Sequence, residues 1–287
     1  MSSQITTAFV EQYSNNVQLL SQQKGSLLRD KVDSETVQGK NAFFEQIGSV
    51  TAQVRTTRHA PTPQLDTPHA RRRVSLADYE YADLIDDQDK VRTLIDPTST
   101  YAQAAAFAMG RAMDDVIISA ATGTAFTGVS GGTSTSLPGG QAITESGTDG
   151  LTIAKLRNAK RIMDLNSVDA SIPRYIVVSP RQIDDLLGTT SVTSADFNTV
   201  RALVTGEVNT FMGFQFIVSN RLSIASSKRL CFAYAADGIK LAVGKDVMSR
   251  IDERSDKGYA TQIYYCMSIG ATRMEEDKVV SIQAHEA

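Results

Sequence analysis

The spacing of hydrophobic and polar residues changes several times along the chain, and each pattern predicts a different element. Residues 4–22 place an apolar side chain near every fourth position, which predicts a helix with one apolar face. These side chains are Ile5, Phe9, Tyr13, Val17 and Leu20. Residues 26–49 mix short apolar and polar runs, and we expect an extended arm with short strands or turns there.

Residues 50–81 contain the pattern of a long hairpin. Apolar and polar residues alternate in 50–54 and again in 74–76, as they do in strands. The polar segment between them contains three prolines, which exclude a helix. An isolated two-stranded hairpin is marginal in water, and this one has little to bury within its own subunit. We therefore expect it to lie on another subunit.

Two helices are predicted after the hairpin. Residues 82–95 place apolar side chains on one helical face, and Asp96 with Pro97 is typical of a helix start. The alanine-rich run 97–122 then predicts a long helix that ends at Gly123.

Residues 123–150 are rich in Gly, Ser and Thr, which predicts a long surface loop and a boundary. The rest of the chain alternates helices and strands. The expected helices are 153–163, capped by Thr152, then 180–188 and 196–204. The expected strands are 175–178, 213–218, 230–234, 239–243, 263–269 and 280–282, with an Asp237-Gly238 turn.

Composition narrows the class of protein. The 287 residues carry a formal charge of −3, which argues against a protein that mainly coats nucleic acid. No secretory signal and no apolar run of membrane-spanning length is present, so we expect a soluble protein made in the cytoplasm. Cys231 and Cys266 lie in strand-like runs and are expected to be small buried residues of a reduced compartment.

The sequence contains few residues or motifs that could support catalysis. No nucleotide-binding, nucleophile-elbow or zinc-protease motif occurs, and the glycine-rich segment 128–140 lacks the lysine of a phosphate-binding loop. His59 and His69 are expected to be exposed polar residues, since no His or Cys pair has metal-ligand spacing. Asp114 and Asp115 are adjacent, point in different directions on a helix, and are expected to bond a neighbouring arginine such as Arg111. We expect no enzyme activity, cofactor or metal.

Charge is unevenly distributed between two neighbouring segments. The hairpin carries a basic set, which is Arg55, Arg58, Arg71, Arg72 and Arg73. The next segment carries an acidic set, whose candidate contact residues are Asp83, Asp86, Asp87 and Asp89. This asymmetry favours head-to-tail pairing between identical copies. Nucleic-acid binding by the arginines is disfavoured because no aromatic residue lies between Arg55 and Arg73, and ion pairs within one chain remain an alternative.

Four stretches of the chain resemble a known family. The longest is DYEYADLIDDQDKVRTLIDPTSTYAQAAAFAMGRAMDDVIISAATGTAFTG. The others are FVEQYSNNVQLLSQQKGSLLRD, YIVVSPRQIDDLL and GEVNTFMGFQFIVSN. Together they resemble the major capsid proteins of tailed bacteriophages with the HK97-type fold, over essentially the whole chain.

The resemblance implies an α+β fold with five parts. These are an N-terminal arm (1–49), an E-loop hairpin (50–81), a P domain with the spine helix (82–123), an A domain (124–243) and a return to the P-domain sheet (244–287). It also implies a structural subunit of the virion shell, assembled in the bacterial host cytoplasm. Pentamers and hexamers of identical subunits would form an icosahedral head around double-stranded DNA.

Two departures from the family pattern change the expected partners. Only about 50 residues precede the hairpin, so scaffolding is expected to be a separate protein. No lysine lies between Lys40 and Lys90, so an isopeptide bond from the hairpin is not available and the shell is expected to be locked non-covalently. The other expected partners are a portal protein, a cement or decoration protein and packaged DNA in non-specific contact, with no membrane. An encapsulin-type compartment is the alternative function, and a cytoplasmic α/β enzyme is a weaker one.

Overall fold

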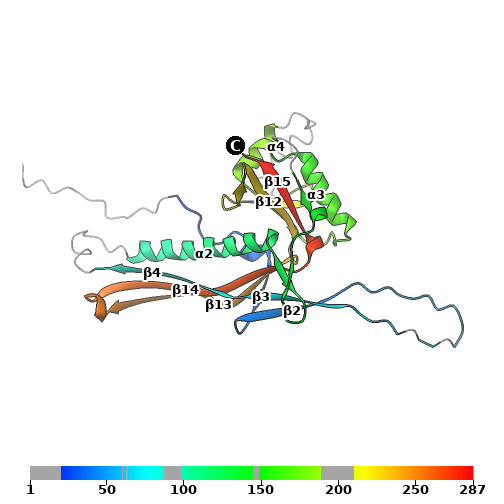
Figure 1. Ribbon diagram of the computed structural model, residues 1–287. Helices are drawn as coiled ribbons and strands as arrows, with labels where there is room; N and C mark the ends of the chain where they lie inside the picture. The colour runs from blue at the N-terminus through cyan, green and yellow to red at the C-terminus, as the bar shows by residue number, and fades with distance from the viewer. Residues whose placement is uncertain are drawn as a thin grey trace, which may run out of the picture.

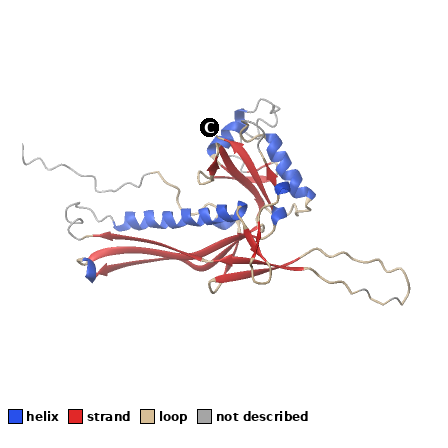
Figure 2. Cartoon of the chain, viewed as in Figure 1, coloured by secondary structure: helices blue, strands red, loops and turns tan. Residues whose placement is uncertain are grey.

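The structure is a computed structural model that describes residues 21–59, 61–62, 64–86, 98–144, 149–188 and 210–286. Figure 1 shows one long helix on an elongated sheet, a second sheet flanked by helices above one end, and a hairpin that projects beyond the same end. Figure 2 shows that strands account for most of the regular structure.

The elongated sheet has the strand order β1-β13-β14-β4. Its strands are β1 (Asp33–Thr36), β13 (Ile239–Arg254), β14 (Ala260–Arg273) and β4 (Ala77–Ile85). β1 is parallel to β13, and the other pairs are antiparallel. The long helix α2 (Thr98–Thr122) lies along one face of this sheet (Figure 1). Met113 and Ile117 of the helix, and Met267 and Ile269 of β14, are buried in the same core, which holds the helix to the sheet.

A seven-stranded sheet forms the upper part of the molecule, with the order β7-β15-β12-β8-β10-β9 and β11 beside β12. Its strands are β7 (Ala142–Ile143), β8 (Arg174–Val178), β9 (Thr210–Phe211), β10 (Phe214–Val218), β11 (Ile224–Ala225), β12 (Lys228–Ala235) and β15 (Val279–His285). The helices α3 (Ile153–Leu165) and α4 (Pro180–Gly188) flank it (Figure 1). Every residue of β8 is buried, as expected for a central strand covered on both faces.

A third sheet joins the hairpin to the body in the order β2-β3-β5-β6. Its strands are β2 (Asn41–Ile47), β3 (His69–Ser75), β5 (Ala125–Thr127) and β6 (Thr133–Thr135). Four short 3-10 turns complete the described elements: Arg29–Lys31, Gly139–Gln141, Ser255–Lys257 and Glu276–Lys278.

Most helices and strands that were predicted from a clear hydrophobic periodicity are confirmed. The long helix spans Thr98–Thr122, and Thr152 caps α3 by accepting a hydrogen bond from the Lys155 backbone N–H. The strands expected in 175–178, 213–218 and the C-terminal part are present as β8, β10 and β12 to β15. Met212 and Gly213 both have positive φ, so they form the tight turn between β9 and β10.

Three expectations are wrong. Residues 82–85 belong to strand β4 rather than to a helix, because this stretch pairs with β14. Residues 50–54 lie beyond the hairpin strands, and β2 (Asn41–Ile47) pairs with β3 instead. The segment 123–150 contains strands β5, β6 and β7 and is therefore not simply a loop. The Gly128 and Gly131 backbones have positive φ between β5 and β6, where those glycines allow a tight turn.

Four further expectations concern residues that the structure does not describe or divides differently. The expected helix 196–204, the start at Asp96 and Pro97, and all but the last two residues of the helix 4–22 lie outside the described residues. The segment 244–287 is divided between the two larger sheets, since β15 pairs with β12 of the seven-stranded sheet.

Candidate assembly surfaces

The hairpin leaves the body at the base formed by β2 and β3. The Gly48 backbone N–H donates to the Pro68 carbonyl at 2.9 Å, which closes the paired part of the hairpin. Every described residue from 48 to 70 is exposed, including Val54, whose exposed fraction is 88%. A segment with this many solvated residues contributes little to the stability of its own subunit.

Arg71 and Arg72 have partners within the chain. The Arg71 Nε donates to Glu45 Oε1 at 2.6 Å, and the guanidinium lies 5.4 Å from the centre of the Phe43 ring. Arg72 is buried, pairs with Glu276 and donates from Nε to the Met274 carbonyl at 2.9 Å. The bonds of Arg72 join the base of the hairpin to the turn between β14 and β15, whereas Arg71 joins β3 to β2 across the hairpin.

Arg73 differs from its two neighbours. Its guanidinium lies 4.8 Å from the centre of the Phe126 ring, a cation–π distance. In the part of the chain that the structure describes, no carboxylate oxygen lies within 4 Å of it, and its buried Nε has no hydrogen-bond partner. A side chain on Gly131 would lie 2.6 Å from Arg73 Cβ, so the glycine makes room for the arginine stem.

The hairpin tip and the end of β4, which carries Asp83, lie at opposite ends of the molecule (Figure 1). Arg55 donates to the Thr57 carbonyl at 3.1 Å, and Arg58 is exposed. Asp83 accepts from the Leu84 backbone N–H at 2.9 Å, and Asp86 is exposed. Among described residues no ion pair joins the two sets. Asp87 and Asp89 lie outside the described residues.

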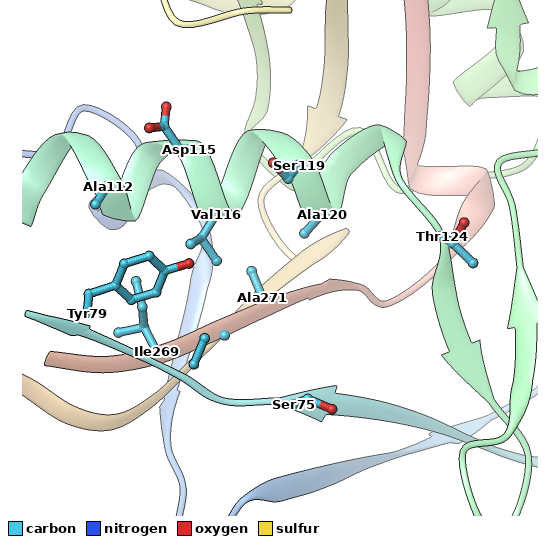
Figure 3. A pocket seen from close by; sticks show the side chains of 12 residues that line it. Ser75, Tyr79, Ala112, Asp115, Val116, Ser119, Ala120, Thr124, Ile269 and Ala271 are labelled. Carbon is cyan, nitrogen blue, oxygen red and sulfur yellow. The ribbon is translucent and has the colours of Figure 1, made fainter.

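A groove of about 390 Å³ runs between α2 and the start of β4 (Figure 3). Ala112, Val116 and Ala120 of the helix form one wall, and Ile269 and Ala271 of β14 form its floor. Small side chains on this part of the helix keep the groove open. The rim carries polar groups, which are Ser75, Tyr79, Asp115, Ser119 and Thr124.

Asp114 ties the N-terminal arm to the long helix. Its buried carboxylate accepts from the Ser26 hydroxyl, the Gln23 amide and the backbone N–H groups of Leu27 and Leu28. One turn earlier, a side chain on Gly110 would lie 2.4 Å from the Gly25 backbone. The arm and helix therefore touch backbone to backbone.

The expected partner of the two aspartates on α2 is wrong. Arg111 donates to the Gln22 side chain and the Gln23 carbonyl instead. Asp115 pairs with Arg221, whose Nε lies 2.5 Å from Asp115 Oδ1. Sequence spacing could not find these partners, since they lie about 90 and 106 residues away along the chain.

Arg273 is a buried cation that sequence analysis did not single out. Its guanidinium donates to the carbonyls of Ala121, Gly123 and Thr135, and its Nε lies 3.6 Å from Glu276. Burial lowers the pKa of this guanidinium below its ordinary value. A cation at the C-terminal end of α2 satisfies carbonyls that the helix leaves without partners.

Groups for catalysis are scarce in the described part of the chain. Cys231 and Cys266 are buried free thiols in different sheets, and burial raises the pKa of Cys231 to about 12. Neither a metal-binding cluster nor a helix able to cross a membrane is found among the described residues. The molecule instead offers charged ends, a solvated hairpin and a groove, which are features of an assembly subunit.

Comparison with known protein families gives one match, to the model of a phage capsid protein, over residues 5–286. The chain belongs to this phage capsid protein family. It is a structural subunit of the icosahedral head, located in the virion shell, rather than an enzyme. No curated protein sequence matches the chain.

Solved capsids share the fold of this phage capsid protein. The capsid of the cyanophage P-SCSP1u is 20% identical, with a TM-score of 0.77, over 100% of this chain and 96% of that one. The capsid of Ralstonia phage GP4 is 11% identical, with a TM-score of 0.77, over 97% and 96%. The capsid of a native GTA particle, with C5 symmetry, is 12% identical with a TM-score of 0.70 and covers both chains completely. The α+β, HK97-type fold is thereby confirmed.

Proposed function

We propose that copies of this capsid protein associate head to tail, with the hairpin of one copy lying across the next copy in a ring. The observation that carries this proposal is the run of exposed residues from 48 to 70, which projects away from its own subunit (Figure 1). Exposed Val50, Val54 and Leu65 in this segment gain burial only against another surface.

Charge supports the same arrangement. The basic tip and the acidic end of β4 lie at opposite ends of the subunit, so they cannot pair within one copy (Figure 1). A contact between unlike ends is heterologous, and a heterologous contact closes into a ring when its rotation allows. Pentamers and hexamers of such a contact build the shell, with the hairpin arginines that have no ion pair in the described chain facing acidic groups of the neighbour. These arginines are Arg55, Arg58 and Arg73, and the candidate acidic groups are Asp83, Asp86, Asp87 and Asp89.

The intrachain bonds of Arg71 and Arg72 divide the basic set into two roles. Arg72 holds the hairpin base to the body and Arg71 pairs across the hairpin with Glu45, whereas Arg55 and Arg58 form no ion pair in the described part of the chain. Reversing the charge of buried Arg72 would therefore disturb folding as well as assembly. Arg55 and Arg58 are therefore the better pair for testing assembly, because changing them should not disturb folding.

We assign domain roles on the same basis. The long helix and elongated sheet form the P domain, the seven-stranded sheet forms the A domain around the five- and six-fold axes, and the hairpin is the E-loop. A separate scaffolding protein, a portal protein and a cement protein are the proposed partners during and after assembly. Packaged double-stranded DNA contacts the inner wall without sequence preference.

Electron microscopy of the purified protein, alone and with a candidate scaffold, tests the proposal. We expect closed shells or rings of five and six from the unmodified chain. The double variant Arg55→Glu, Arg58→Glu should fold normally and fail to close shells, because like charges then face each other. The control Arg55→Lys, Arg58→Lys keeps both charges and should assemble. Normal shells from the reversed variant would contradict the role of the tip.

A further inference from the structure

The outward face of the sheet β2-β3-β5-β6 combines aromatic and basic side chains. We call it the Arg–Phe face and define it by Phe43, Ile47, Arg71, Arg73, Phe126 and Val129. Strand pairing assembles it from three separate segments, since Phe43 lies opposite Arg73 and Arg73 lies opposite Phe126. The two aromatic rings and the arginine between them therefore form one row across the sheet.

The face is exposed although its side chains are largely apolar. The exposed fractions are 41% for Phe43, 70% for Ile47, 39% for Phe126 and 87% for Val129. A hollow of about 380 Å³ opens where β3 continues past the end of β5. Ala70, Thr127 and Val129 line it together with His69, Gly128 and the Arg71–Glu45 ion pair. Aromatic and arginine side chains are enriched at protein–protein contact centres, and the face carries both next to this hollow.

Arg73 shows which charge the partner carries. Its stem is held by the Gly131 backbone and its guanidinium by the Phe126 ring, so the cation is fixed in place. No carboxylate of the described chain pairs with it. A guanidinium that lacks an ion pair in its own subunit can form one with an anionic partner.

One segment of the chain has the complementary features. β4 is the last strand of its sheet, so one of its edges has no strand partner among the described residues. Glu80 and Leu84 lie on the same face of this strand, away from α2, and Asp86 follows the strand directly. Leu84 is 43% exposed, and neither acid belongs to an ion pair in the described part of the chain.

We propose that the Arg–Phe face binds the acidic end of β4 of the next copy, with Leu84 entering the hollow and a flanking carboxylate facing the Arg73 guanidinium. This inference rests on the head-to-tail association proposed above and names the surfaces that meet. The end of β4 lies at the left end of the elongated sheet and β2 and β3 lie near its other end (Figure 1), so only a second copy can bring the two surfaces together.

Cysteine cross-linking tests the contact directly. The double variant Val129→Cys, Leu84→Cys should form covalent oligomers on oxidation or with a short bis-maleimide, while each single variant stays monomeric on denaturing gels. Both native cysteines are buried and do not interfere. The matched control pairs Val129→Cys with Leu165→Cys, which is 68% exposed on α3, and should give no oligomers.

Adding Arg73→Glu to the cross-linking pair should lower the cross-linking rate about tenfold, because like charges then face each other. Arg73→Lys should restore most of the rate. Unchanged cross-linking in Arg73→Glu, together with poorer retention of packaged DNA by its shells, would assign the face to nucleic acid and overturn the proposal.

The outcomes separate this contact from the association on which it rests. Closed shells without a Val129–Leu84 cross-link overturn the contact and leave the head-to-tail proposal intact. Absence of shells and rings from the unmodified chain, with and without scaffold, contradicts the association and the contact with it.

Discussion

Among single residues, Asp114 joins the N-terminal arm to the long helix, about 90 residues further along the chain. Its carboxylate is buried and accepts hydrogen bonds from four donors in residues 23–28. Asp115 next to it lies at the surface and pairs with Arg221. Two adjacent and chemically identical side chains therefore have different energetic roles, which their surroundings decide.

Asp114→Ala should lower the free energy of unfolding of the unassembled subunit by about 3 kcal/mol, because buried backbone N–H groups then lose their acceptor. The measurement is urea denaturation followed by circular dichroism. Asp115→Ala is the matched control and should cost at most about 1 kcal/mol, since its ion pair is exposed. Equal losses in the two variants would contradict the assigned role of Asp114.

The limits of sequence analysis are clearest for the basic set. Charge alone grouped Arg71, Arg72 and Arg73 as one contact surface. The fold gives Arg72 an acid 204 residues away and gives Arg73 an aromatic ring from β5. Strand register and the contacts between the three sheets bring these partners together. The spacing of residues along the sequence does not show such contacts. The uneven distribution of charge itself was visible in the sequence.

At the scale of elements, periodicity predicted the long helix and the C-terminal strands because each has a continuous apolar face. It failed at residues 82–85, where the apolar spacing also fits a helix and only pairing with β14 decides for a strand. It also missed β5 and β6, which are three residues each, and β6 consists only of Thr and Ser. Such short strands are stabilised by their neighbours rather than by their own pattern.

The end of β15 is held to other elements by one carboxylate. Glu286 pairs with Arg229 of β12 and accepts from Gln182 of α4 and from Ser179 just before that helix. Its hydrogen bond with Arg229 is the largest cause that lowers its pKa from 4.5 to about 2. The Glu286 carboxylate therefore binds a proton more readily in the unfolded chain than in the folded one. The stabilisation that it provides is complete above pH 4.5 and is lost as the pH falls toward 2.

Glu286→Gln should therefore weaken the pH dependence of stability. Urea midpoints of the unassembled subunit at pH 7 and pH 3 measure it, and the drop between them should be smaller in the variant than in the unmodified chain. At pH 7 the variant should be the less stable of the two, because it lacks the charge-assisted bonds to Arg229. An identical drop in both proteins would contradict this assignment.

At the scale of the whole molecule, folding and assembly use different residues. The buried core lies under α2 and within the seven-stranded sheet, whereas the hairpin beyond Gly48 is solvated throughout its described length. Natural subunits retain such a costly extension only if it acts outside the subunit.

Replacing residues 49–67 with an Asn-Gly turn tests this separation. The Gly48 N–H and the Pro68 carbonyl already face each other, so a short turn fits between them. The unassembled variant should keep its unfolding free energy within about 0.5 kcal/mol. It should form no closed shells by electron microscopy. Shells of normal yield from the shortened chain would contradict the assembly role of the hairpin.

The antiparallel pairing of β4 with β14 determines when β4 can fold during translation. Ile85 pairs with Thr261, so β4 can pair only after about 180 further residues have been translated. At bacterial or eukaryotic elongation rates this takes on the order of 10 to 40 s. Until then β4 has no strand partner among the described residues, and its acidic edge has no fixed shape. A truncated nascent chain thus lacks the surface that a neighbour would recognise, and incomplete subunits are kept out of the growing shell.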